Sequence, residues 1–187
     1  MLKLLFVFTL ASTLSAQTTW NGLHFRMTPG DAKAYMKSQG FDVRAVGEDE
    51  THQIATPDYE LQLPNLIVAF PFQPEFNFNS TGLSVITLGL DVPKWLERVS
   101  GNNMFTAVIL AAEDIHDALV TKYGQPVSVE GPCNNVTVSL LFNSEGVMTC
   151  KTKWKGDSQM ISVYWSYYRS PEKFAYFLQY QPQSNGL

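Results

Sequence analysis

Charged side chains are scarce in this sequence. Asp, Glu, Lys and Arg make up 16% of the 187 residues, and the 17 acids outnumber the 13 bases. Nucleic acids and anionic membrane surfaces attract proteins through clustered Lys and Arg, so a net charge of −4 argues against both as general partners. Aromatic residues reach 13%, a composition typical of a globular chain rather than a disordered one.

The sequence also lacks the common catalytic motifs. It contains no CxxC, no HExxH, no phosphate loop and no nucleophile elbow. The three histidines are His24, His52 and His116, and only Glu113-x-x-His116 has metal-type spacing. A carboxylate-bridged iron site needs a second such helix, so this pair is more simply the polar face of one helix. The sequence therefore predicts no catalytic residue, no metal ligand set and no cofactor.

Long apolar runs are confined to the start of the chain. Lys3 precedes an apolar stretch from Leu4 to Leu10, and Ala16 offers a small residue before Gln17. This pattern predicts a secretory signal peptide over residues 1–16, too short to anchor in a bilayer. No later stretch approaches the roughly 18 apolar residues of a membrane span. We therefore expect an exported protein, periplasmic or secreted, with no membrane span.

Only two cysteines are present, Cys133 and Cys150, and both follow the predicted leader. In an oxidising compartment a disulfide is the expected state of such a pair. It would close a loop of about 17 residues and add roughly 3 kcal/mol of stability. Two free thiols or a metal site are the alternatives, although two cysteines supply only half of the four zinc ligands.

The clearest structural pattern lies between Gly101 and Pro126. Apolar residues recur there at steps of three and four, which predicts an amphipathic helix. The central residues of its apolar face are Val108, Ala111, Ile115 and Leu119. Asn102 or Asn103 is suited to cap the start of this helix, and Gly124 to end it.

A shorter helix is predicted after Thr28, with Pro29 in the first turn and Gly40 at the end. Asp91 is suited to cap another short helix that includes Trp95. Residues 41–57 are polar and poorly patterned. Within them Glu48-Asp49-Glu50 is most simply a solvated loop, and attraction of a cation by the three acids is the alternative. Alternating apolar residues predict strands in these stretches: residues 59–63, 66–72, 76–78, 83–90, 136–142, 147–154, 161–167 and 174–180.

These elements predict an α+β fold, with antiparallel β-meanders packed against one long and one short helix. A single domain is expected over residues 17–182, followed by a polar tail at 183–187. Phe78–Leu83 and Phe142–Val147 are similar strand–turn–strand segments, each downstream of a helix that ends at glycine. They are consistent with a tandem of halves at 17–92 and 101–182, and two ordinary hairpins would explain them as well.

The opening Trp20-x-x-Leu23-x-Phe25-x-Met27-Thr28-Pro29 resembles the start of exported domains of the BamE (SmpA/OmlA) type. Their unit of a helix and an antiparallel meander also occurs, in tandem, in β-lactamase inhibitory proteins. The segment from Lys122 to Pro126, followed by strands and Trp154, is similar to the second half of other secreted proteins of this design. The resemblance covers about a third of the chain and implies protein–protein binding in the envelope. The chain departs from BamE in its greater length and in lacking a cysteine for lipid attachment.

The C-terminal strands are rich in aromatic residues. One face must form the core, and the other carries Tyr164, Tyr168 and Phe177. Exposed aromatics on a sheet make good contacts with proteins or glycans, whereas a sheet covered on both sides would bury them. We expect an exported, non-enzymatic binding module whose partner is another protein or an envelope component. The alternative is a small secreted or periplasmic hydrolase whose site is assembled from residues distant in sequence.

Overall fold

The computed structural model describes residues 20, 22–48, 50–63, 68–99, 103–133, 136–137, 146–169 and 172–183. The predicted leader, most of the predicted 136–142 strand with the turn after it, and all but one residue of the C-terminal tail lie outside these residues. The described helices are α1 (Pro29–Ser38), α2 (Val92–Arg98) and α3 (Met104–Tyr123). The described strands are β1 (Asp42–Ala45), β2 (His52–Thr56), β3 (Tyr59–Leu61), β4 (Phe70–Asn79), β5 (Gly82–Leu90), β6 (Ser128–Glu130), β7 (Val147–Lys155), β8 (Gln159–Arg169) and β9 (Glu172–Pro182).

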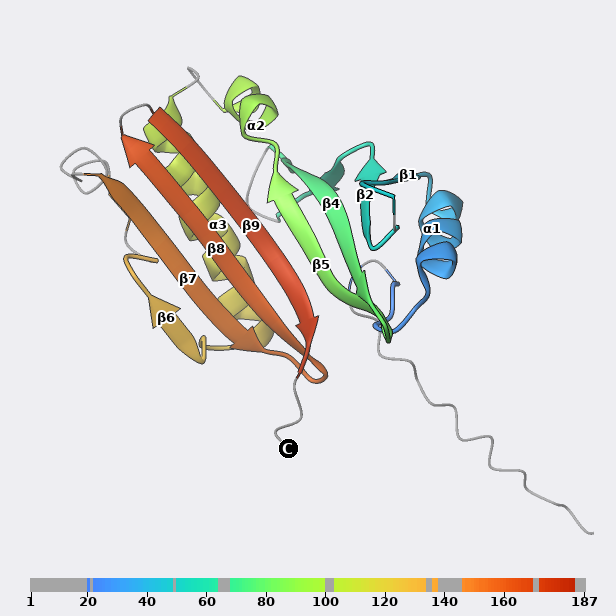
Figure 1. Ribbon diagram of the computed structural model, residues 1–187. Helices are drawn as coiled ribbons and strands as arrows, with labels where there is room; N and C mark the ends of the chain where they lie inside the picture. The colour runs from blue at the N-terminus through green and yellow to red at the C-terminus, as the bar shows by residue number, and fades with distance from the viewer. Residues whose placement is uncertain are drawn as a thin grey trace, which may run out of the picture.

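All nine described strands belong to one antiparallel sheet, which confirms the predicted α+β class. Their order is β1-β2-β4-β5-β9-β8-β7-β6, with β3 paired beside β2 on β4. The strands of the two candidate halves meet where β5 pairs with β9. This pairing covers only Ile86–Gly89 against Phe177–Tyr180, and Figure 1 shows the two strands diverging beyond it.

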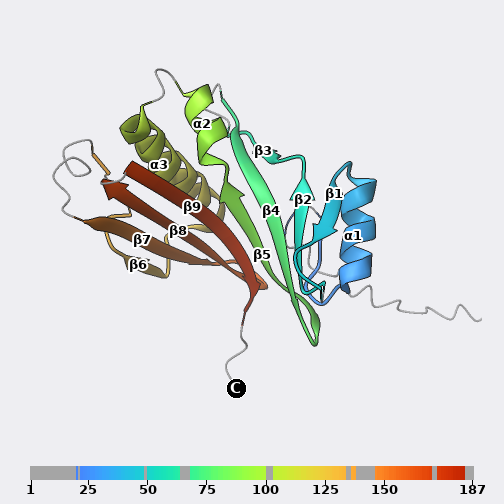
Figure 2. The same cartoon turned by 45° about the horizontal axis from the view of Figure 1, so that its top comes forward.

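The helices α1 and α3 cover the same face of this sheet (Figures 1 and 2). Strand pairing places one row of side chains across seven strands: Trp154, Ile161, Tyr180, Ile86, Phe76, Gln53 and Ala45. At one end of this row, Trp154 contacts His116 of α3 edge-on, with ring centroids 5.3 Å apart. Toward the other end, the Gln53 amide donates to the Pro29 carbonyl of α1 at 3.5 Å. We call this helix-covered side the inner face and the opposite side the outer face.

The long helix α3 forms as its sequence pattern predicts. The Asn103 side chain accepts a hydrogen bond from the Thr106 amide at 3.3 Å, and Gly124 ends the helix with a positive φ of 78°. The predicted apolar face is confirmed, since each of its four central residues is buried. His116 differs from the prediction of a solvated polar residue. Its ring is half-buried against Trp154, because the polar side of α3 still borders the sheet.

Helix α1 and the segment before it are fixed at the end of the β4–β5 hairpin. Thr28 caps the helix, since its hydroxyl oxygen accepts from the Asp31 amide at 3.2 Å. Arg26 and Met27 exchange backbone hydrogen bonds with Leu83 at the start of β5. The approach is so close that a Cβ on Gly82 would lie 2.4 Å from the Arg26 carbonyl oxygen. Glycine is therefore required there, also because its φ is +104°.

Helix α2 connects the inner-face core to the first turn of α3. Trp95 is buried, its ring lies 4.2 Å from that of Phe70, and its indole N–H donates to the Ala107 carbonyl at 3.2 Å. Lys94, also in this helix, forms an ion pair with Asp58, with 2.7 Å between Lys94 Nζ and Asp58 Oδ2. Helix α2 is the additional short helix predicted to begin after Asp91, whose side chain accepts a hydrogen bond from the Lys94 amide. The structure thus describes three helices, one more than the long and the short helix expected to pack on the meanders.

Residues 41–57 show no strand pattern in the sequence, yet the strands β1 and β2 lie within them. The inward positions of β2 are Gln53 and Ala55, one polar and one small, so the strand lacks the apolar alternation that reveals a strand. Glu48 and Glu50, in the loop between β1 and β2, are exposed as expected. The three-residue strand β6 was also missed, because it is too short to show a period.

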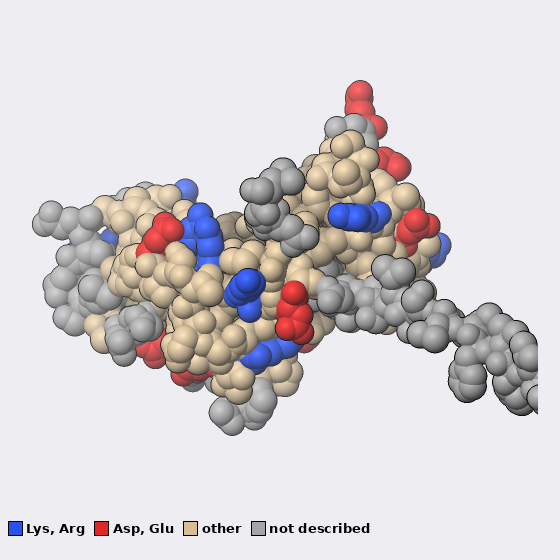
Figure 3. Space-filling model, turned by 90° about the horizontal axis from the view of Figure 1, so that it is seen from below, with Lys and Arg blue, Asp and Glu red and all other residues tan. Residues whose placement is uncertain are grey.

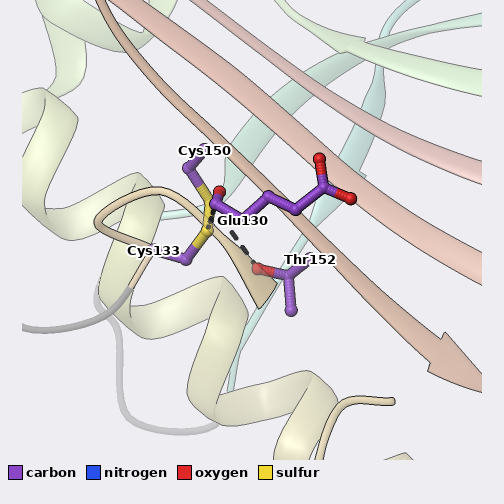
Figure 4. The surroundings of a disulfide bond; sticks show 4 residues. All are labelled: Glu130, Cys133, Cys150 and Thr152. Atoms are coloured by element: carbon purple, nitrogen blue, oxygen red, sulfur yellow. Dashed lines mark hydrogen bonds between the residues drawn. A yellow bond between two sulfur atoms is a disulfide. The ribbon is translucent and has the colours of Figure 1, made fainter. Parts of the chain in front are cut away.

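The predicted disulfide between Cys133 and Cys150 is confirmed (Figure 4). The two Cα atoms lie 5.0 Å apart, well inside the reach of a disulfide bridge. Both cysteines are buried, and the Thr152 hydroxyl lies 3.6 Å from Cys150 Sγ, close enough to donate to it. The bridge attaches the segment after β6 to the middle of β7.

None of the helices that the structure describes has the length and apolar content needed to cross a bilayer.

Loss of the disulfide should destabilise the fold, because the bridge restricts the unfolded chain over a separation of 17 residues. We expect the double variant Cys133→Ser, Cys150→Ser to lose about 3 kcal/mol of unfolding free energy in urea titrations. A reducing agent should destabilise the wild type by a similar amount and leave the double variant unchanged. Equal stability of wild type and double variant would contradict a structural role for the bridge.

Candidate functional site

The outer face carries a polar row of side chains across its centre. Strand pairing brings these residues into one line: Ser128, Lys153, Ser162, Gln179, Thr87, Glu75, Ile54 and Arg44. At its middle, the Gln179 amide donates to the Thr87 hydroxyl at 3.3 Å. A neighbouring row places aromatic side chains beside it: Glu130, Lys151, Tyr164, Phe177, Gly89 and Gln73. The outer face is therefore polar and aromatic, in contrast to the apolar inner face.

Two of the three predicted binding residues lie together. Tyr164 of β8 and Phe177 of β9 are directly opposite each other across the strand pair. Tyr168 lies on the same face, four residues or about 13 Å along β8. Tyr164 and Tyr168 are each 41% exposed, and Phe177 is half-buried. Among the described elements, no helix lies over this part of the outer face (Figures 1 and 2), so the alternative of a sheet covered on both sides does not hold for the described chain.

Phe177 lies opposite a glycine of β5. That residue is Gly89, and a Cβ placed there would lie 3.5 Å from the Phe177 ring. This is an ordinary van der Waals distance, so the ring lies directly over the position of Gly89, at the last residue pair that joins β5 to β9. An aromatic ring across from a strand glycine compensates for the surface that glycine leaves uncovered.

Two shallow hollows lie on either side of Phe177. The first, of about 240 Å³, is lined by Lys151, Lys153, Ser162, Tyr164, Phe177, Gln179 and Gln181. The second, of about 210 Å³, is lined by Gln73, Glu75, Gly89, Leu90, Asp91 and Phe177. Phe177 is the residue that they share, so its ring separates them. We call them the lysine hollow and the acidic hollow after their charged residues.

The charges of the two hollows are only partly compensated. Neither Lys151 nor Lys153 forms an ion pair with a described carboxylate. In the acidic hollow, one Glu75 oxygen lies 3.1 Å from His52 Nε2, and one Asp91 oxygen accepts from the Lys94 amide at 3.1 Å. Each carboxylate retains a second oxygen for a ligand. Seen from the end of the molecule (Figure 3), the described surface shows scattered charges of both signs without a continuous field of either.

Sequence reasoning missed the charged residues of both hollows. Lys151 and Lys153 alternate along β7, which is a signal that they share a face. Glu75 and Asp91 come from β4 and the turn after β5, and only the order of the strands shows that they lie near Phe177. That order is not visible in residue periodicity.

Perturbed acids occur elsewhere, on helix α3. Burial raises the pKa of the Glu113 and Asp114 carboxyls above their ordinary values, and the nearby Asp117 carboxylate raises both further. Burial lowers the pKa of His116. These groups belong to the inner-face side of the sheet and line neither hollow. In the described part of the chain, no three His, Cys, Asp or Glu side chains come close enough to hold a metal ion.

Comparison of this chain with family models, with curated proteins and with solved structures gives no match.

Removing the Asp114 charge should stabilise the protein at neutral pH. A raised pKa means that the folded state binds the proton more readily than the unfolded chain, so the charge opposes folding above this pKa and the penalty fades as the pH falls. Asp114 Oδ2 is also buried without a partner among the described residues. We expect Asp114→Asn to raise the unfolding free energy at about pH 7, and the gain to shrink toward about pH 3.5, near the ordinary Asp pKa.

Urea titrations at the two pH values measure this difference. Asp157→Asn, at an exposed turn, is the matched control and should change stability little at either pH. A loss of stability in Asp114→Asn at neutral pH would contradict the assignment.

Proposed function

We propose that the protein is an exported, non-enzymatic binding module that contacts another protein or an envelope component through its outer face. Tyr164 and Phe177 form the centre of the contact, and Tyr168 extends it along β8. The observation that carries this proposal is the opposed pair Tyr164–Phe177 on a sheet face that no described helix covers.

Exposed aromatic side chains favour binding for energetic reasons. Tyr and Phe present large apolar area with few rotatable bonds, so ordering them on binding costs little entropy. The strands on both sides of β8 and β9 hold the backbone of the pair in place, so the surface is already formed before a partner arrives. Aromatic residues at the centre of an interface commonly contribute 2 kcal/mol or more each.

The alternative of a hydrolase receives less support from this arrangement. A hydrolytic site needs an acid, base or nucleophile with a shifted pKa inside a cleft. The described carboxyls with raised pKa, Glu113 and Asp114, lie across the sheet from both hollows. The charged residues that do line the hollows are suited to recognising charge on a partner.

Export is supported by two features. Residues 1–16 have the pattern of a signal peptide, and the buried disulfide suits an oxidising compartment. The resemblance to exported helix-and-meander domains points to the same role, protein–protein binding in the envelope.

Shortening either anchor should weaken binding and leave the fold intact, because both side chains face away from the core. We expect Tyr164→Ala and Phe177→Ala each to raise the dissociation constant for the partner at least about tenfold. The unfolding midpoint of Tyr164→Ala should stay close to that of the wild type. Thr149→Ala, an exposed residue on the same face of β7, is the control and should bind normally.

The partner for this experiment is a protein that immobilised wild type retains from an extract of the compartment where the protein resides. Calorimetric titration then measures the dissociation constants. Unchanged affinity in both anchor variants would contradict the proposed surface.

A further inference from the structure

We infer that the outer face binds a polypeptide segment that crosses the strands and carries an acidic and a basic side chain. The acidic side chain pairs with Lys151 and Lys153, and the basic one with Glu75 and Asp91. This inference rests on the proposed function, because it names the chemistry of the partner at the same face.

The charges of the two hollows have opposite sign, and Phe177 separates them. The only charged side chains in the first hollow are lysines, and the only ones in the second are carboxylates. Lys153 and Glu75 lie on strands that are four steps apart in the sheet, so the two sets of charges are too far from each other to pair directly. A ligand that spans the ring can therefore neutralise both, and electrostatic complementarity of this kind fixes the orientation of a partner.

Strand pairing sets the length of such a ligand. Lys153 and Glu75 belong to the same row and are separated by four steps between neighbouring strands. At about 4.8 Å per step this is roughly 19 Å, the length of about six residues of extended chain. The floor between them is made of small or flexible polar side chains, Ser162, Gln179 and Thr87, which leave room for a backbone and can hydrogen-bond to it.

The mixed charge favours a polypeptide over the other ligands that aromatic surfaces bind. An acidic glycan or a lipid headgroup could satisfy the lysine hollow, but it would place no cation in the acidic hollow. An anionic ligand long enough to cover both hollows would desolvate the free oxygens of Glu75 and Asp91 without a partner, which is costly; a shorter one would leave the acidic hollow unused. A peptide segment supplies both signs, and an apolar residue between them can pack on Phe177 and Tyr164.

Selection from a phage-displayed library of random twelve-residue peptides tests this inference on the mature chain with its disulfide intact. We expect the enriched sequences to share an Asp or Glu and a Lys or Arg about four to six positions apart, around an apolar residue. The double variant Lys151→Glu, Lys153→Glu should weaken binding of the best selected peptide at least tenfold. Replacing the acidic residue of that peptide by lysine should restore binding to this variant.

The charge-matched control is Lys33→Glu with Lys155→Glu, two exposed lysines outside both hollows, and it should bind the selected peptide normally. Glu75→Lys should also weaken binding of the selected peptide. Replacing the basic residue of that peptide by an acidic one should restore binding to this variant. The inference would be overturned if the enriched peptides lacked this charge pair. It would also be overturned if neither the lysine-to-glutamate double variant nor Glu75→Lys changed the affinity for the selected peptide.

The outcomes also separate this inference from the proposed function. If selected peptides bind without the charge pair but lose affinity in Tyr164→Ala, the face is a binding surface and only the charge assignment is wrong. If they bind Tyr164→Ala and Phe177→Ala as well as wild type, the proposed surface itself is wrong. If no peptide is enriched and polygalacturonate, an acidic glycan, binds in a manner that depends on Lys151 and Lys153, the polypeptide assignment is overturned in favour of a glycan.

Discussion

The short pairing of β5 with β9 is the constraint on which the rest of the structure depends. Four residue pairs join the strands that follow α1 to the strands that follow α3. Their register places Ile86 beside Tyr180 in the core and Gly89 beside Phe177 on the outer face. Because successive side chains of a strand point to opposite sides, a slip of one residue would exchange the two faces along the whole row. The pairing thus fixes both the common core under α1 and α3 and the position of the Phe177 ring.

The two faces of the sheet differ in composition and in burial. The inner face buries most of the large aromatic side chains, including Trp154, Trp165 and Tyr176. Tyr164 and the lysines of β7 lie outside this core, on an outer face that is polar and charged. The pairing of β5 with β9 ends at Gly89 and Phe177, and the acidic hollow is lined by these two residues and by Leu90 and Asp91, which follow on the chain.

Much of this organisation could be predicted from sequence, and the reasons are local. The period and caps of α3, the spacing of the two cysteines and the alternation along β8 and β9 are short-range signals. They predicted the helix, the disulfide and the outward position of Tyr164. The strands β1, β2 and β6 gave no such signal, because they are short and Gln53 faces inward. The order of the strands is a long-range property, so the nearness of Glu75 to Phe177 could only be seen in the structure.

The central claim is that the outer face, and not the helix-covered side, meets the partner. Site-specific photo-crosslinking in the cells that produce the protein tests it most directly. A photoreactive phenylalanine derivative replaces Tyr164 on the outer face or Thr121, an exposed residue of α3 on the opposite side. The account predicts a discrete crosslinked partner from position 164 and none from position 121. A crosslink from position 121 alone would contradict it.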